Sequence, residues 1–170
     1  MIRRCAAALA ITALLAGCGS STEKPAAKAA ATAQATATPT PAASGMKDTA
    51  QKPVIPKPTG KPPTKLVVKD IVKGTGPAAK AGDTISVQYV GDSFSNGRQF
   101  DASWDRGQAF QFQLGAGMVI PGWDKGIAGM KAGGRRELII PPKLAYGPAG
   151  SGPIGPNETL IFVVDLQQIG

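Results

Sequence analysis

Two aspartates, Asp101 and Asp105, are the first candidates for chemistry in this sequence, because paired carboxylates can perform the acid–base work of a hydrolase. Their spacing alone does not establish such a pair, since carboxylates in solvated loops are far commoner. The chain has no histidine, which excludes histidine triads, histidine metal sites and histidine acid–base catalysis. No cysteine follows Cys18, so the rest of the chain has no thiol nucleophile, disulfide or cysteine metal site. An enzymatic domain in this chain would therefore work without a nucleophile, a metal or a cofactor.

A glycine-rich segment, GSGPIG at 150–155, matches the G-x-G-x-x-G pattern of dinucleotide-binding loops. In such loops a strand leads into the glycines and a helix follows them. Here no strand precedes the segment, and the residues from Thr159 onward have the pattern of a strand. The match is therefore not interpreted as a nucleotide site.

The first 18 residues, MIRRCAAALAITALLAGC, have the layout of an export signal. Arg3 and Arg4 precede an apolar run from Cys5 to Gly17, which is too short to span a bilayer comfortably. The final LAGC resembles a bacterial lipobox, in which Cys18 receives a lipid and becomes the mature N-terminus. An ordinary signal peptide cleaved near Ala16 or Gly17 is the alternative. We expect an extracytoplasmic lipoprotein that is anchored in the membrane by its lipid chains.

Residues 19–64 are rich in Ala, Thr, Pro and Lys and have almost no large apolar side chains. Such a segment cannot bury enough surface to offset the entropy of ordering, so the composition predicts a disordered tether. The lysines of this segment also carry much of the net charge of +8. The remaining domain, 65–170, has 11 basic and 9 acidic residues, a net charge of only +2, and its basic side chains are scattered. No nucleic-acid partner is expected, because a phosphate-binding face needs clustered positive charge.

Strands dominate the prediction for the domain at 65–170. All nine aromatic residues lie between Tyr89 and Phe162, so the hydrophobic core must form there. Asn96-Gly97 is a typical hairpin-turn signal. Runs of apolar residues, or their alternation with polar ones, predict strands at 65–72, 83–89, 110–114, 135–140 and from 159 onward.

One segment predicts a helix. Pro121 suits a first helical turn, and Trp123, Ile127 and Met130 have helical spacing. Two glycines weaken this helix, so it should depend on packing against the sheet. The predicted class is α+β, with an antiparallel sheet wrapped on one short helix.

Six ordered motifs span the domain. They are VQYVG at 87–91, GRQFDAS at 97–103, FQFQLG at 110–115, VIPGWDKG at 119–126, LAYG at 144–147 and TLIF at 159–162. In this order they resemble FKBP-type peptidyl-prolyl cis-trans isomerases, in a bacterial lipoprotein form once the leader is included. The resemblance implies a twisted antiparallel β-sheet half-wrapped around one short α-helix, with an aromatic pocket between them.

The resemblance also implies roles for individual residues. Asp101, Tyr146 and Ile120 would be catalytic, with the Tyr146 hydroxyl and the Ile120 backbone N–H bonded to the bound peptide. Asp101 would sit at the pocket edge, oriented by neighbouring side chains. The residues implied to bind substrate are Tyr89, Phe100, Arg106, Phe110, Val119, Trp123, Ile154 and Phe162, with Trp123 as the floor. By pattern alone, Phe110 and Phe162 are equally well explained as core residues, and a tryptophan such as Trp123 on a short helix is usually a core residue.

The implied activity is isomerisation of Xaa-Pro bonds in exported proteins. This reaction breaks no covalent bond, so the absence of histidine and cysteine is compatible with it. The expected partners are proline-containing segments of exported proteins and macrolide inhibitors, and the protein is expected to be a monomer. The loop after Tyr146 is one residue short, and Ile154-Gly155-Pro156 departs from the commonest family pattern, which leaves macrolide affinity open. Two alternatives remain, a non-catalytic lipid-anchored module that binds proline loops and a chaperone.

Overall fold

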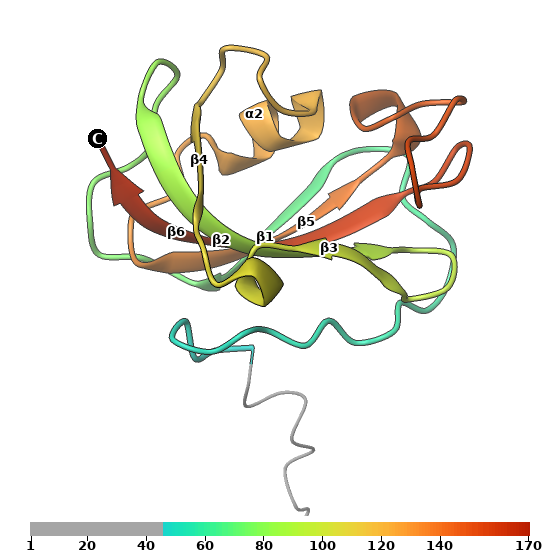
Figure 1. Ribbon diagram of the computed structural model, residues 1–170, viewed down its shortest axis with the longest axis horizontal. Coiled ribbons are helices and arrows are strands. Elements are labelled where there is room, and N and C mark those ends of the chain that lie inside the picture. The colour runs from blue at the N-terminus through green and yellow to red at the C-terminus, as the bar shows by residue number, and fades with distance from the viewer. Residues whose placement is uncertain (1–45) are drawn as a thin grey trace, which may run out of the picture. The chain divides into compact units, whose positions relative to one another are not determined.

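The computed structural model describes residues 46–170, and the leader and residues 19–45 of the expected tether lie outside this range. Six strands form one sheet: β1 (Val67–Val72), β2 (Thr84–Ser93), β3 (Gln99–Ala102), β4 (Phe110–Gln113), β5 (Gly134–Ile140) and β6 (Leu160–Ile169). One short α-helix, α2 (Pro121–Ile127), lies over one face of the sheet (Figure 1). Short 3₁₀ turns occupy Trp104–Arg106 (η1) and Pro142–Leu144 (η2). The predicted α+β class, an antiparallel sheet with one short α-helix, is confirmed.

The sheet has the order β1-β5-β6-β2-β3, and every pairing is antiparallel. The outer side of β2 is shared by two short strands, because β4 pairs with its first half and β3 with its second half. The chain between them, residues 103–109, leaves the sheet. Ser103 anchors the start of this loop, since its buried hydroxyl accepts the backbone N–H of Tyr89 at 2.8 Å.

Helix α2 approaches β5 closely because two of its residues are glycines. A Cβ on Gly122 would lie 2.4 Å from the Ile140 side chain, and one on Gly126 would lie 2.7 Å from Leu138. The glycines that weaken the helix in the sequence are thus required by its packing. The predicted helical spacing reached Met130, but the helix ends at Ile127, because Ala128 leaves the helical conformation with ψ of 133° and Gly129 then turns left-handed with φ of 77°. Met130 is still buried in the core.

Both faces of the sheet are covered, so the polar residues of β2 are buried as well as the apolar ones with which they alternate. Ser86 and Gln88 are buried, and Ser103 hydrogen-bonds the Gln88 side chain. The main core lies between α2 and the sheet. A second cluster lies on the opposite face, with the buried members Ile55, Val90, Ala102, Ile161 and Val163.

This second cluster is covered by an N-terminal segment, residues 46–64, here called the arm. Figure 1 shows the arm crossing the side of the sheet opposite α2. Met46 packs against the second cluster and Ile55 is buried in it. The arm carbonyls of Met46 and Gln51 accept hydrogen bonds from Arg135 at 3.2 and 2.7 Å.

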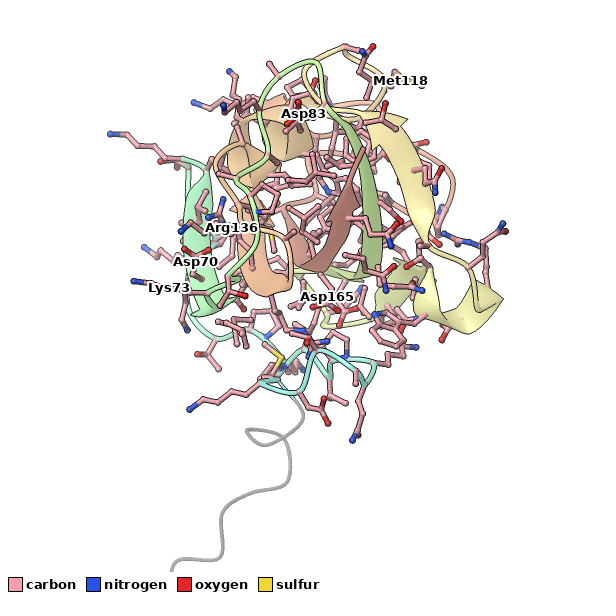
Figure 2. The ribbon with its side chains drawn as sticks, turned by 90° about the vertical axis from the view of Figure 1, so that its left-hand side faces the viewer. Asp70, Lys73, Asp83, Met118, Arg136 and Asp165 are labelled. Carbon is pink, nitrogen blue, oxygen red and sulfur yellow. The ribbon has the colours of Figure 1, made fainter. Side chains whose placement is uncertain are left out.

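The arm corrects the expectation that a disordered tether extends to residue 64. Its low apolar content predicts disorder, but its few apolar residues meet a complementary apolar face of the sheet. Beneath it, Arg135 pairs with Asp165 at 2.5 Å, and both side chains are buried. Figure 2 shows Asp165 on the side of the sheet that faces the arm. The ordered part of the domain therefore includes residues 46–64.

We expect Ile55→Ala to lower the free energy of unfolding by about 2 kcal/mol, because it removes buried methyl groups from the second cluster. Val54→Ala is the matched control, since the neighbouring Val54 side chain is 62% exposed. The control should change stability by no more than about 0.5 kcal/mol. Urea unfolding of the full chain measures both. Equal, small effects of the two substitutions would contradict packing of the arm.

Candidate functional site

A pocket of about 400 Å³ opens between α2 and the sheet. Every strand from β2 to β4 contributes to it, together with β6, α2, the segment before α2 and the loop after η2. The lining residues are Tyr89, Phe100, Asp101, Phe110, Met118, Val119, Ile120, Trp123, Tyr146 and Phe162. The pocket is thus an apolar, ring-lined hollow with one carboxylate at its wall.

Trp123 forms the centre of the ring cluster. Its ring centroid lies 5.0 Å from that of Tyr89 and 5.2 Å from that of Phe162, with interplanar angles of 82° and 87°. Such edge-to-face contacts are favourable for aromatic quadrupoles and hold the indole in one orientation. The Trp123 side chain is buried, and its Nε1–H has no hydrogen-bond partner within residues 46–170. The rings therefore form an apolar floor in which the indole has a fixed orientation.

A polar triad closes one edge of the pocket. The Tyr89 hydroxyl donates a hydrogen bond to Asp101 Oδ2 at 2.5 Å. Arg106 donates from Nη1 to Asp101 Oδ1 and from Nη2 to the Tyr89 hydroxyl at 2.8 Å. The Asp101 side chain is 40% exposed, so the triad lies at the surface of the pocket. The triad fixes the orientation of the Asp101 carboxylate. Both carboxylate oxygens already accept hydrogen bonds, so Asp101 is not placed as a free base for proton transfer.

The triad also sets the ionisation of its members. Burial would raise the pKa of Asp101, but hydrogen bonds from Tyr89 and Arg106 and the Arg106 charge outweigh burial and lower it. Burial and the hydrogen bond to Asp101 raise the pKa of Tyr89 to about 12. At neutral pH the site therefore holds a carboxylate, a neutral phenol and a guanidinium.

Two hydrogen-bond donors face the pocket without a partner in the part of the chain that the structure describes. Ile120 precedes α2, and its carbonyl accepts the N–H of Trp123 at 2.9 Å, whereas its own N–H is unbonded. The Tyr146 side chain is 40% exposed and its hydroxyl is likewise unbonded. Asp124 fixes the segment before α2 by accepting the N–H groups of Gly115 and Gly117 at 2.8 and 3.2 Å. Both donors are available to an extended peptide.

The structure brings together most of the predicted site residues. The predicted residues on the pocket wall are Asp101, Tyr146, Ile120, Tyr89, Phe100, Phe110, Val119, Trp123 and Phe162. Arg106 lies behind the wall and acts through Asp101 and Tyr89. The sequence missed Met118, which is 66% exposed and lies at the outer edge of the fold in Figure 2. Its position directly before Val119 is the signal that could have found it.

Ile154 is separated from the other predicted substrate-binding residues. Its side chain is buried in the main core and is not part of the pocket wall. The backbones of Ser151 and Ile154 bond each other in both directions at 2.9 Å, which forms a tight turn. This turn packs Ile154 against the core, so the expected contact with substrate is not supported.

The possible catalytic pair of carboxylates does not form. Asp101 belongs to the triad, whereas Asp105 accepts hydrogen bonds from Lys52 at 2.5 Å and Gln99 at 2.7 Å. Each carboxylate is occupied by different donors. Within residues 46–170 no three of the His, Cys, Asp and Glu side chains lie together as metal ligands.

Comparison with known proteins places this pocket in a family. Residues 76–167 match the model of the FKBP-type peptidyl-prolyl cis-trans isomerase family. A Streptomyces anulatus FK506-binding protein is 63% identical over 118 residues, which cover 68% of this chain and 95% of that protein. The crystal structure of AtFKBP13 matches with a TM-score of 0.60 and 40% identity, covering 64% of this chain and 96% of that one. The crystal structure of FkpA from Escherichia coli matches with a TM-score of 0.58 and 44% identity, covering 64% of this chain and 50% of that one. This chain belongs to the FKBP family of peptidyl-prolyl cis-trans isomerases.

Proposed function

We propose that this isomerase acts on Xaa-Pro bonds of exported proteins and accelerates their rotation by desolvation and by stabilising the twisted amide. The observation that carries the proposal is the apolar aromatic floor around Trp123, flanked by the unpaired donors of Ile120 and Tyr146. A proline ring fits an apolar hollow, and the adjoining peptide backbone can accept both hydrogen bonds.

The reaction needs a change of environment and no covalent step. Rotation about the Xaa-Pro bond forfeits amide resonance across a barrier of about 20 kcal/mol. The planar amide has the larger dipole, which water stabilises, whereas the twisted amide has less charge separation and a more basic nitrogen. An apolar pocket therefore disfavours the planar state relative to the twisted one. This is differential binding of the transition state.

The polar groups hold the substrate while the bond rotates. Hydrogen bonds from the Ile120 N–H and the Tyr146 hydroxyl would fix the peptide on one side of the rotating bond. Asp101 remains ionised, and its charge near the imide carbonyl favours the twisted state, in which that oxygen is less negative. Together these effects must supply only about 4 kcal/mol for a thousandfold acceleration.

We also propose that the enzyme is a lipid-anchored, extracytoplasmic monomer. The lipobox-like LAGC ending at Cys18 supports the anchor, and the lack of cysteines after it suits a domain stabilised by packing alone. No helix within residues 46–170 has both the length and the apolar character to cross a membrane. Proline-containing segments of exported proteins are the proposed partners. The name of the Streptomyces relative, an FK506-binding protein, supports macrolide inhibitors as further ligands.

We expect Phe162→Ala to reduce kcat/KM for a short Xaa-Pro peptide at least tenfold, because it opens the wall beside Trp123 to water. Phe94→Ala is the matched control, since it removes the same ring from the opposite face of the sheet. The control should retain activity at a temperature where both variants are folded. A wild-type rate no greater than that of Phe162→Ala would favour a binding module without turnover.

We expect the rate to be constant between about pH 5 and pH 9 and to fall only in stronger acid. The lowered pKa of Asp101 keeps the carboxylate ionised above its ordinary value of 3.8, and its charge is lost as the pH falls through the lowered value. Tyr89, with a pKa of about 12, stays neutral throughout this range. Arg106→Met should move the acid limb to higher pH, because burial of Asp101 would then be less opposed. A change of the rate between pH 6 and pH 8 would contradict the assignment of the acid limb to Asp101.

We expect Cys18→Ala to release the protein from the membrane fraction of the expressing cells, because the substitution removes the atom that would carry the lipid. Mass spectrometry of the mature N-terminus provides the direct measurement. A mature N-terminus near Gly17 that carries Cys18 without a lipid would show an ordinary signal peptide and remove the anchor. The isomerase activity of the released variant should be unchanged.

A further inference from the structure

The turn that supplies Arg106 has little packing of its own. None of the residues of η1 is buried, although Arg106 completes the triad with Asp101 and Tyr89. Within the turn, the N–H of Arg106 bonds the carbonyl of Ser103 at 3.0 Å and the N–H of Gly107 bonds that of Trp104 at 3.1 Å. These short-range bonds shape the turn but do not attach it to the domain.

Side chains outside the turn provide this attachment. Lys52 of the arm contacts Asp105 Oδ1 at 2.5 Å, and Gln99 of β3 bonds Asp105 Oδ2 at 2.7 Å. Trp104 packs against the second cluster, to which Ile55 of the arm belongs. Consecutive residues of η1 thus face different ways, with Trp104 and Asp105 toward the arm contacts and Arg106 toward the pocket edge.

Lys52 has a second carboxylate nearby. Asp92 on β2 is buried, and its Oδ1 has no hydrogen-bond partner among the described residues. Burial raises the pKa of Asp92, and the charge of Lys52 opposes that shift. Lys52 therefore acts on two carboxylates, the exposed Asp105 of the turn and the buried Asp92 of β2. This makes it more than an isolated surface ion pair, which contributes little.

We infer that Lys52 and Asp105 are positioning residues for the isomerase reaction, because they hold the turn that presents Arg106 to Asp101. The inference rests on the proposed function of the pocket. The same arm that joins the domain to the N-terminal part of the chain thus sets the geometry of the pocket edge. The charged and titratable groups facing Asp101 are Tyr89 from β2 and Arg106 from η1. Asp105 pairs with Lys52 and also feels the charge of Arg106, and the neutral Gln99 side chain donates a hydrogen bond to it.

The test measures the ionisation of Asp101 by carboxyl ¹³C NMR in the full chain, together with the pH–rate profile. Lys52→Met should raise the pKa of Asp101, move the acid limb of the profile to higher pH, and lower kcat/KM about three- to fivefold, the scale of one ion pair. Lys52→Arg should restore all three. Lys47→Met is the matched control, since Lys47 is an exposed arm lysine, and it should behave as the wild type.

Asp105→Asn separates positioning from a direct field effect. Loss of a neighbouring negative charge would by itself lower the pKa of Asp101. Loss of the attachment that holds Arg106 would raise that pKa, so the two explanations predict opposite signs. An upward shift supports the inference, and a downward shift overturns it.

Other outcomes are equally decisive. If Lys52→Met leaves the Asp101 titration and the acid limb unchanged while lowering the melting temperature, the arm only stabilises the fold and the inference is overturned. If the pKa of Asp101 shifts as expected but the wild type isomerises no peptide, the positioning of the triad stands and the proposed reaction fails.

Discussion

The close contact between α2 and β5 is the constraint on which the pocket depends. Gly122 and Gly126 present no side chain to Ile140 and Leu138, so the helix backbone lies directly against the strand. At this separation Trp123, which lies between the two glycines, is buried and meets the rings of Tyr89 and Phe162 edge to face. A helix held farther away by larger side chains would withdraw the indole and leave the pocket without a floor. Two residues that weaken the helix locally are therefore needed by the tertiary structure.

The pocket separates its apolar and polar functions in space. The rings make the floor apolar, while the triad of Asp101, Tyr89 and Arg106 lies at the edge, where part of each charged side chain remains exposed to solvent. Because Asp101 receives donors on both oxygens, it is a fixed charge rather than an acid or base. This arrangement suits a reaction that changes the polarity of one amide and moves no proton.

The two faces of the sheet have different roles, and the turn between β3 and β4 contacts both of them. The face under α2 holds the pocket, and the opposite face is covered by the arm. The interrupted edge of β2 lets the chain leave the sheet between β3 and β4, so η1 touches both sides. The turn connects the two faces, because Trp104 packs against the second cluster and Arg106 bonds Asp101 at the edge of the pocket. The fold thus links the segment nearest the N-terminal part of the chain to the site.

The sequence by itself determined the local elements and the excluded chemistry. Alternation predicted the strands, Asn96-Gly97 predicted the hairpin and Pro121 the start of the helix, because these signals depend on neighbouring residues. The ordered motifs identified the residues of the pocket wall, since a family pattern records a tertiary arrangement that periodicity cannot. Only the tertiary structure shows that Ile154 lies in the core, that Asp101 and Asp105 bond different donors, and that the arm packs on the sheet. The physical reason is that a residue is buried only when a second surface, contributed by residues distant in the sequence, packs against it. A segment as poor in apolar residues as the arm becomes ordered only where distant strands present the matching apolar face, and no local pattern contains that partner.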